Sequence, residues 1–191
     1  MQHKFKEYIK QFPFYSDEAF EVALPYFKEI VLKKGEHFVE EGKTCKKIAF
    51  IQEGLFRTYY LKDGIEITTC FCKENTLTTS FKSLITKQVS ELSIQATEES
   101  TIWVIQYHDL EILYSKNLFW QQVGRLVAQQ EFINAECYTR FLNDQNAKQR
   151  YLHILENESD LLQRVPLLYL ASYLQIAPET LSRIRKEITT T

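Results

Sequence analysis

Polar and cationic side chains recur at helical spacing near the C-terminus, in the stretch that begins at Pro178. The members are Glu179, Thr180, Ser182, Arg183, Arg185 and Lys186. Arginine can donate two hydrogen bonds to a guanine edge, glutamate can accept one from cytosine, and the major groove of DNA admits one helix. The same pattern is typical of a solvated charged face on a helical hairpin, so spacing alone leaves both interpretations open.

Two short helices joined by a tight turn are predicted to position these side chains. Pro178 suits the first position of the second helix, where its missing N–H would have no partner. Apolar residues recur at helical spacing in the first helix: Leu168, Leu170, Ala171 and Leu174. The second helix has its own apolar face: Leu181, Ile184 and Ile188. Gln175-Ile176-Ala177 forms the turn, where such motifs often carry glycine.

Charge and composition limit the classes of function. The chain has 191 residues and a net charge of −2, which excludes a generally basic nucleic-acid coat. Residues 164–191 nevertheless carry four basic and two acidic side chains, so positive charge is local to the predicted helix pair. No apolar run is long enough to span a bilayer, and the N-terminus does not resemble a signal peptide. We therefore expect a cytoplasmic protein with no membrane partner.

Cysteines and histidines give no sign of a metal or cofactor site. The cysteines Cys45, Cys70, Cys72 and Cys137 lack Cys-x-x-Cys spacing and are expected to be reduced thiols. Cys70 and Cys72 would share one face of a strand, which leaves a redox or metal pair as an alternative. The four histidines are scattered and are expected to be surface or hydrogen-bonding residues. No cofactor and no metal are expected.

The first half of the chain is predicted to form a small β jelly roll of about eight strands. After two short helices over residues 4–12 and 16–27, the hydrophobic period changes to two, with glycines between the strand-like segments. Lys62-Asp63-Gly64 predicts a tight hairpin turn. A short helix or loop is expected at residues 80–86. Aromatic and thiol side chains either fill the roll or line a site for an apolar ligand: Phe50, Phe56, Tyr59, Cys70 and Phe81.

A long helix is predicted from Leu118 to about Asn157, with a break near residues 143–146. One side repeats in steps of three and four residues: Phe119, Val123, Leu126, Gln130, Ile133, Cys137 and Phe141. Such a seam indicates pairing with a second helix, although a helix lying on its own β domain would also need apolar residues. The fold class is α+β, with a roll over 1–116, a connecting dimerisation helix over 117–157 and a helix-turn-helix over 158–191.

This order of elements resembles the Crp/Fnr superfamily of bacterial transcription regulators. The resemblance covers essentially the whole chain. It rests on LKKGEHFVEEG, IAFIQEGLFR, ELSIQATEESTIWVI and, most specifically, LASYLQIAPETLSRIRK. The chain looks like the branch of the superfamily that is common in Bacteroidetes.

The resemblance implies a homodimer that places one recognition helix in each of two major grooves. Carried over by position, Glu179, Thr180, Ser182 and Arg183 fall where the family contacts bases. We expect Arg183 to read guanine and Glu179 cytosine, while Thr180, Arg185 and Lys186 mostly hold phosphates. The operator would be an inverted repeat with half-sites about 34 Å apart. RNA polymerase and a small-molecule effector of unknown identity and site are the further partners that the resemblance suggests.

Two departures from the family pattern change what we expect. The cyclic-nucleotide cassette has Gly-Glu and then Arg-Ser or Arg-Thr, whereas this chain has Thr79-Ser80 and Ser90-Glu91. The charged groups that hold ribose and phosphate are missing, and Glu91 would repel a phosphate, so binding of cyclic AMP or cyclic GMP is not expected. The sequence also ends soon after the recognition helix, so the family's β-wing is expected to be absent or truncated.

The best interpretation is a sequence-specific DNA-binding transcription regulator rather than an enzyme. The first alternative is a ligand- or partner-binding regulatory module whose helix-turn-helix is vestigial. The second is a cupin-type enzyme, but His37 lacks the companion ligands that cupin chemistry needs. No motif for a nucleophilic triad or a glycine-rich phosphate loop is present either.

Overall fold

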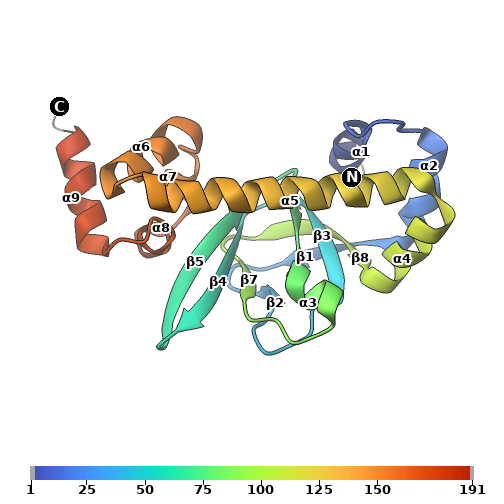
Figure 1. The fold of residues 1–191 in the computed structure, drawn as a ribbon, viewed down its shortest axis with the longest axis horizontal. Coiled ribbons are helices and arrows are strands. Elements are labelled where there is room, and N and C mark those ends of the chain that lie inside the picture. Colours follow the sequence, from blue (N-terminus) through green and yellow to red (C-terminus); the bar gives the residue numbers. More distant parts are fainter. Residues whose placement is uncertain (1–2, 190–191) are drawn as a thin grey trace. The chain divides into compact units, whose positions relative to one another are not determined.

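The computed structural model describes residues 3–189, and Figure 1 shows their fold. The chain forms two compact units. One takes the residues up to Tyr60 together with Cys70–Ala128, and the other takes Leu61–Thr69 and the residues from Gln129 onward. The long helix α5 (Leu118–Asp144) therefore contributes to both units. The tip of an early β hairpin belongs with the C-terminal part of the chain.

The period-two segments form the β roll that the sequence predicts. In the described part of the chain, eight strands make two four-stranded sheets, with the orders β1-β8-β3-β6 and β2-β7-β4-β5. Apolar side chains from both sheets pack together, among them Phe38, Ile51, Phe56, Ile94 and Ile102. The strands are β1 (Phe27–Leu32), β2 (His37–Val39), β3 (Lys47–Glu53), β4 (Phe56–Lys62), β5 (Ile65–Cys72), β6 (Leu77–Thr78), β7 (Ser93–Ala96) and β8 (Ser100–Gln106).

Helices cover the other face of the first sheet. They are α1 (His3–Lys10), α2 (Asp17–Ala23) with a 3-10 turn over Leu24–Tyr26, α4 (Tyr107–Lys116) and the first turns of α5. Ser16 caps α2, because its Oγ accepts a hydrogen bond from the Ala19 N–H at 3.1 Å. Large apolar side chains from these helices and the sheet form one cluster, which includes Phe5, Phe20, Phe50, Trp103, Leu113, Phe119 and Trp120.

The first turns of α5 belong to this cluster, which corrects part of the predicted seam. Phe119 and Val123 are only 7% and 5% exposed, so neither can pair with a second helix. The prediction that they line a dimer interface was therefore wrong. Phe50 was expected in the roll interior, but it faces these helices because its neighbour Ile51 takes the interior position.

Two turns of the roll depend on left-handed backbone. Asp63 and Gly64 have φ angles of +52° and +79°, which confirms the tight turn of the β4–β5 hairpin. Gly54, between β3 and β4, has φ +104° and packs against Ser100. A Cβ atom at Gly54 would lie 2.7 Å from the Cα of Ser100, so only glycine fits there. A short helix, α3 (Phe81–Thr86), interrupts the strand pattern as expected.

Short helices follow α5 and pack on one another. They are α6 (Ala147–Asn157), α7 (Leu161–Arg164), α8 (Leu167–Tyr173) and α9 (Pro178–Thr189). Asn146 begins α6 with a capping box to Gln149, which explains the predicted break after Asp144. The buried side chains of these helices and of the residues that end them are Tyr151, Ile154, Leu161, Val165, Leu170, Ala171, Leu174, Leu181 and Ile184. None of the helices within residues 3–189 has the length and apolarity to cross a membrane.

Candidate nucleic-acid interface and effector region

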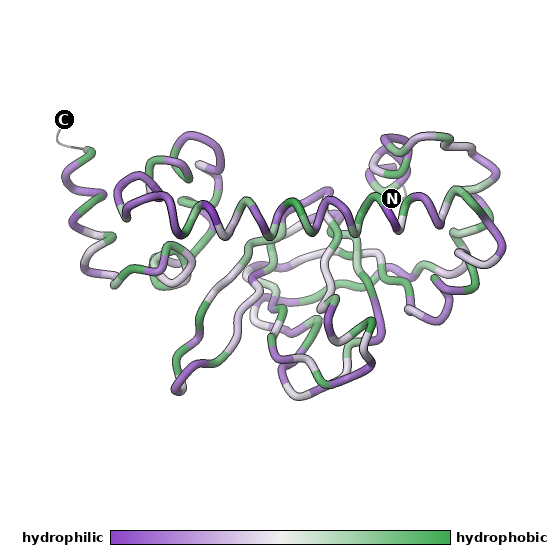
Figure 2. The backbone as a smooth tube through the Cα atoms, in the orientation of Figure 1, coloured by the Kyte–Doolittle hydropathy of each residue, from purple (hydrophilic) through white to green (hydrophobic). Residues whose placement is uncertain are grey.

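Helix α9 presents the predicted contact residues to solvent. Leu181 and Ile184 are buried, which fixes the rotation of the helix about its axis. Figure 2 shows hydrophilic and hydrophobic residues alternating along it. The predicted contact residues lie away from the buried face, with Thr180 half-buried and the rest exposed: Glu179, Ser182, Arg183, Arg185 and Lys186. The structure thus leaves five of the six side chains exposed, with Thr180 at the border of the buried face.

The turn before α9 holds a non-glycine residue in a left-handed conformation. Gln175 has φ +52°. Its N–H donates to the Ser172 carbonyl and the Ile176 N–H donates to the Ala171 carbonyl, both at 3.0 Å. This is the Schellman pattern that normally uses glycine at this position. The turn therefore keeps the geometry of a helix-turn-helix although its sequence lacks the usual residue.

Two polar side chains of α9 interact within the C-terminal unit. Ser182 Oγ donates a hydrogen bond to the Pro178 carbonyl at 3.0 Å. Lys148 Nζ lies 2.6 Å from a Glu187 carboxylate oxygen and lowers the pKa of that carboxyl. Arg183 lowers the same pKa as a weaker contribution. Both cations therefore offset the negative charge of Glu187 on the helix.

The tip of the β4–β5 hairpin is hydrogen-bonded to α8. The Thr68 N–H donates to Ser172 Oγ at 2.9 Å, and Ser172 Oγ donates to the Glu66 carbonyl at 3.0 Å. The two segments are 104 residues apart in sequence, so sequence reasoning missed this contact. One serine hydroxyl thus joins an extended strand to the first helix of the helix-turn-helix.

The C-terminal end of the predicted seam also packs within its own chain. Phe141 lies half-buried among aromatic rings, with centroid distances of 6.0 Å to Tyr173 and 6.2 Å to Tyr138. Tyr138 itself stacks on Tyr173 at 5.4 Å. Phe141 therefore supports α8 within its own chain, and its assignment to a dimer interface stays a prediction.

The middle of α5 is the part of the seam that stays open. Every residue from Ala128 to Cys137 is exposed, including the predicted Gln130 and Ile133, while Leu126 is half-buried. Phe132 is 67% exposed and lies beside Ile133, but the three-four repeat had passed over it. Two large apolar side chains on one solvated stretch of helix are typical of an interaction surface.

Serine hydroxyls lie at the two positions that the sequence predicts to replace the charged residues of the cyclic-nucleotide cassette. Ser80 and Ser90 are both buried, and their hydroxyls form a hydrogen bond at 2.9 Å. Glu91 is exposed and makes an ion pair with Lys82 at the start of α3. These contacts bring together the two segments predicted to replace the cassette, with neither an arginine nor a glutamate turned inward at those positions.

A buried arginine on β4 is the polar feature that the sequence did not reveal. The guanidinium of Arg57 lies 4.1 Å from the centroid of the Tyr59 ring, and its Nη2 donates to Gln95 at 2.9 Å. His37 and Tyr59 share a further hydrogen bond at 2.9 Å, which confirms a hydrogen-bonding role for His37. A buried arginine looks like a solvated strand residue in the sequence, since only cross-strand neighbours distinguish the two.

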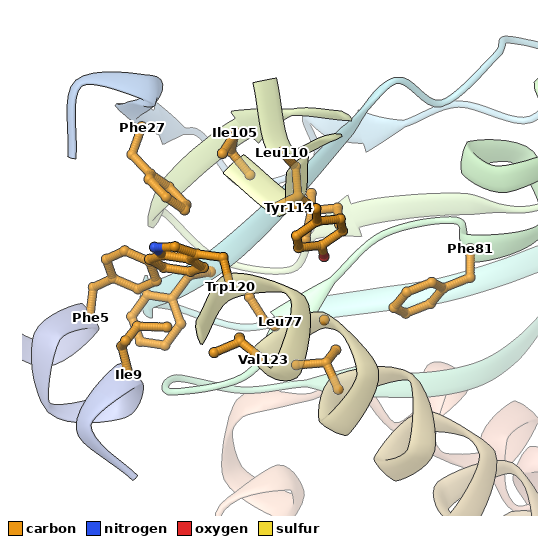
Figure 3. Close-up of a pocket in the computed structure, with 14 residues that line it drawn as sticks. Phe5, Ile9, Phe27, Leu77, Phe81, Ile105, Leu110, Tyr114, Trp120 and Val123 are labelled. Atoms are coloured by element: carbon orange, nitrogen blue, oxygen red, sulfur yellow. The ribbon is translucent and has the colours of Figure 1, made fainter. Parts of the chain in front are cut away.

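Two hollows in the N-terminal unit differ in size and lining. An apolar cavity of about 60 Å³ lies between α1, the first sheet, α4 and α5. Figure 3 shows the side chains that line it, among them Phe81 and Tyr114. The cavity has room for about two water molecules, far less than a nucleotide needs. A surface groove of about 640 Å³ has a mixed lining that includes Lys46, Lys87, His108 and Glu111. The groove is large enough for a small metabolite.

The described residues contain no group of three or more metal-ligating side chains. What they do contain is a β roll, a long helix with an open middle stretch, and a helix-turn-helix whose second helix has a polar exposed face. These features define an architecture in which a β roll is followed by a long helix and a helix-turn-helix.

Known proteins with this architecture are found by comparison. Residues 29–117 match the family model of the cyclic nucleotide-binding domain. No curated protein sequence matches the chain significantly. FixK2 from Bradyrhizobium japonicum is similar in structure, with a TM-score of 0.74, 19% identity, and coverage of 86% of this chain and 85% of that one.

Two further solved structures are similar to this chain in fold. A protein from Eubacterium rectale assigned to the Crp/Fnr family of transcriptional regulators has a TM-score of 0.73 and 16% identity, covering 95% of this chain and 88% of its own. The catabolite activator protein of Thermus thermophilus has a TM-score of 0.57 and 19% identity, covering 93% and 85%. Residues 29–117 are therefore similar to the cyclic nucleotide-binding domain, and the chain has the fold seen in the Crp/Fnr regulators.

Proposed function

We propose that the protein is a sequence-specific DNA-binding transcription regulator. The observation that supports this best is helix α9, whose apolar side is buried and whose exposed side carries Glu179, Thr180, Ser182, Arg183, Arg185 and Lys186. An arginine on such a face can donate two hydrogen bonds to guanine, while neighbouring cations hold phosphates. Arg183 is the proposed guanine reader, and Glu179 accepts from cytosine.

We also propose that two copies associate through the middle of α5. Phe132 and Ile133 supply the apolar contact, with Leu126, Gln130 and Cys137 on the same stretch. Two-fold symmetry then requires an operator with inverted half-sites about one helical turn apart. RNA polymerase is the proposed partner at the promoter.

The proposed regulator does not use cyclic AMP or cyclic GMP as its effector. A cyclic phosphate needs a cation, and the buried Ser80–Ser90 hydrogen bond stands where the family's charged groups would lie. A small-molecule effector, where one acts, has more room in the 640 Å³ groove than in the apolar cavity.

DNA selection from a random pool, followed by fluorescence anisotropy, tests the DNA-binding role. Arg183→Ala should relax sequence preference at one base pair and weaken binding by about 1–3 kcal/mol. Arg185→Ala removes the same charge from the same helix, so it serves as the matched control. That change should weaken binding to all sequences alike and reduce the salt slope by about one. Weak, sequence-indifferent binding that Arg183→Ala leaves unaltered would favour a regulatory module acting through protein contacts.

Sedimentation velocity tests the association. Phe132→Asp should shift the protein to a monomer, because a charge would enter the apolar contact. Leu118→Asp is the control: Leu118 is 68% exposed on the same helix, against 67% for Phe132, but lies outside the proposed contact. Equal sedimentation of both variants and the parent protein would count against this surface.

A further inference from the structure

Two thiols on strand β5 lie in contact with each other. The Sγ atoms of Cys70 and Cys72 are 3.7 Å apart. Alternate residues of a strand point to the same face, which explains why the two side chains meet. Cys70 is exposed and Cys72 is half-buried, so a reagent in solution reaches Cys70 first.

The spacing allows a disulfide, but a strained one. Two residues of a strand rise about 6.6 Å, close to the upper end of the 4.4–6.8 Å Cα separation, roughly, that disulfides accept. Bond formation therefore requires the strand to contract locally. β5 stands at the edge of its sheet, so only one neighbouring strand resists this change. Strained and exposed disulfides are readily reduced, which makes such a pair reversible.

We propose that Cys70 and Cys72 form a reversible redox pair whose oxidation loosens the contact between the β4–β5 hairpin and α8. The Cys70 thiolate attacks a low-molecular-weight disulfide such as oxidised glutathione, forming a mixed disulfide and releasing one thiol. The Cys72 thiolate then attacks Cys70 Sγ, and the second thiol leaves. The two electrons reduce the oxidant, and the two cysteine protons end on the released thiols.

The effect on α8 follows from the position of Thr68. Its N–H, only two residues before Cys70, donates to Ser172 Oγ, and Thr68 is fully buried. Contraction of β5 displaces this N–H and stretches the bond. Ser172 lies directly before the turn that orients α9. The consequence for DNA rests on the proposed function, whereas the redox chemistry does not.

Intact mass spectrometry of the full chain in glutathione redox buffers tests the pair. The Cys137→Ser variant removes the other exposed thiol and should still lose two hydrogen atoms, mapped to the peptide that ends at Lys73 and reversed by dithiothreitol. Cys72→Ser should instead keep a glutathione adduct on Cys70. A Cys137→Ser protein that stays fully reduced, or that accumulates only mixed disulfides, would overturn the redox pair.

Hydrogen exchange tests the coupling without DNA. Oxidation should speed exchange of the Thr68 and Ile176 amides by about tenfold, the equivalent of about 1.4 kcal/mol. Ser172→Ala should show the fast exchange already when reduced and change little on oxidation. Unchanged exchange in the oxidised parent protein would refute the coupling.

DNA affinity provides the last readout. On a selected operator, oxidation should weaken binding about tenfold. The double variant Cys70→Ser/Cys72→Ser should bind equally in both buffers. If the reduced protein binds no DNA, only the proposed function is refuted, because mass spectrometry and hydrogen exchange still test the redox pair. Equal affinity of the oxidised and reduced parent protein would contradict the regulatory consequence.

Discussion

Gly54→Ala should destabilise the N-terminal unit far more than an ordinary loop substitution. Backbone strain and steric overlap both destabilise the variant at this position. A side chain at φ +104° costs about 1–3 kcal/mol in backbone strain. The new Cβ would also lie 2.5 Å from the Ser100 Cβ and 2.7 Å from its Cα, which are fully buried and cannot rotate away. Overpacking of this kind costs about 1–3 kcal/mol, so the total is about 2–6 kcal/mol.

Gly35→Ala is the matched control, since it shares the strain but not the clash. Gly35 has φ +89°, and a Cβ there would meet nothing within 4 Å. Gly35→Ala should therefore lose only the stability that backbone strain costs, about 1–3 kcal/mol.

Tryptophan fluorescence reports on the right part of the molecule. The chain has two tryptophans, and both Trp103 and Trp120 are buried in the N-terminal unit. Urea unfolding followed at these residues gives the free energy of each variant. A Gly54→Ala protein no less stable than Gly35→Ala would refute the close approach of Gly54 to Ser100.

Three further outcomes are expected. Gln175→Gly should stabilise the helix-turn-helix by about 0.5–1 kcal/mol, because the relief of left-handed backbone strain exceeds the extra entropy that glycine gives the unfolded chain. Slower hydrogen exchange of the Ile176 amide would show this gain in stability, and unchanged exchange would argue against the strain. Burial raises the pKa of Tyr114 from 10.0 to about 12, so the folded state holds this proton more tightly than the unfolded one. The contribution of Tyr114 to the free energy of unfolding is complete below pH 10 and declines as the pH rises to about 12. Urea unfolding of Tyr114→Phe, repeated across this pH range, should lack this decline. Calorimetric titration with cyclic AMP or cyclic GMP should give no binding, and a micromolar affinity would contradict the reasoning about Ser80 and Ser90.

Local signals in the sequence were sufficient for most elements. The Asp63-Gly64 turn, the break after α5 and the start of α9 at Pro178 each depend on one or two residues with restricted backbone preferences. The rotation of α9 followed from Leu181 and Ile184, so its outward face was predictable too. These features need no knowledge of distant neighbours.

The seam on α5 shows where such reasoning ends. A repeat of apolar residues indicates that one face of a helix is buried, but it does not identify the element that packs on that face. Phe119 and Val123 face the chain's own sheet cluster and Phe141 faces α8, while the open middle includes Phe132, which lies outside the repeat. Only the fold could assign each turn of this helix to its partner.

Long-range polar contacts were likewise beyond the sequence. The Thr68–Ser172 bond joins segments that no local pattern connects, and the contacts of the buried Arg57 with Tyr59 and Gln95 are not visible in the residue pattern. Pairing of this kind depends on three-dimensional proximity rather than on residue type.

The division of the β4–β5 hairpin between the two units bears on how proteins of this fold can be recombined. A fragment starting at Gln129 would carry every helix after α5 yet lack Leu61–Thr69, the strand tip that its own unit contains. Grafting a foreign helix-turn-helix onto this roll would succeed best when the donor supplies a hydroxyl at the place of Ser172. Shuffling between relatives is thus expected to respect this matched pair, and chimaeras that split it should need a compensating change in the hairpin.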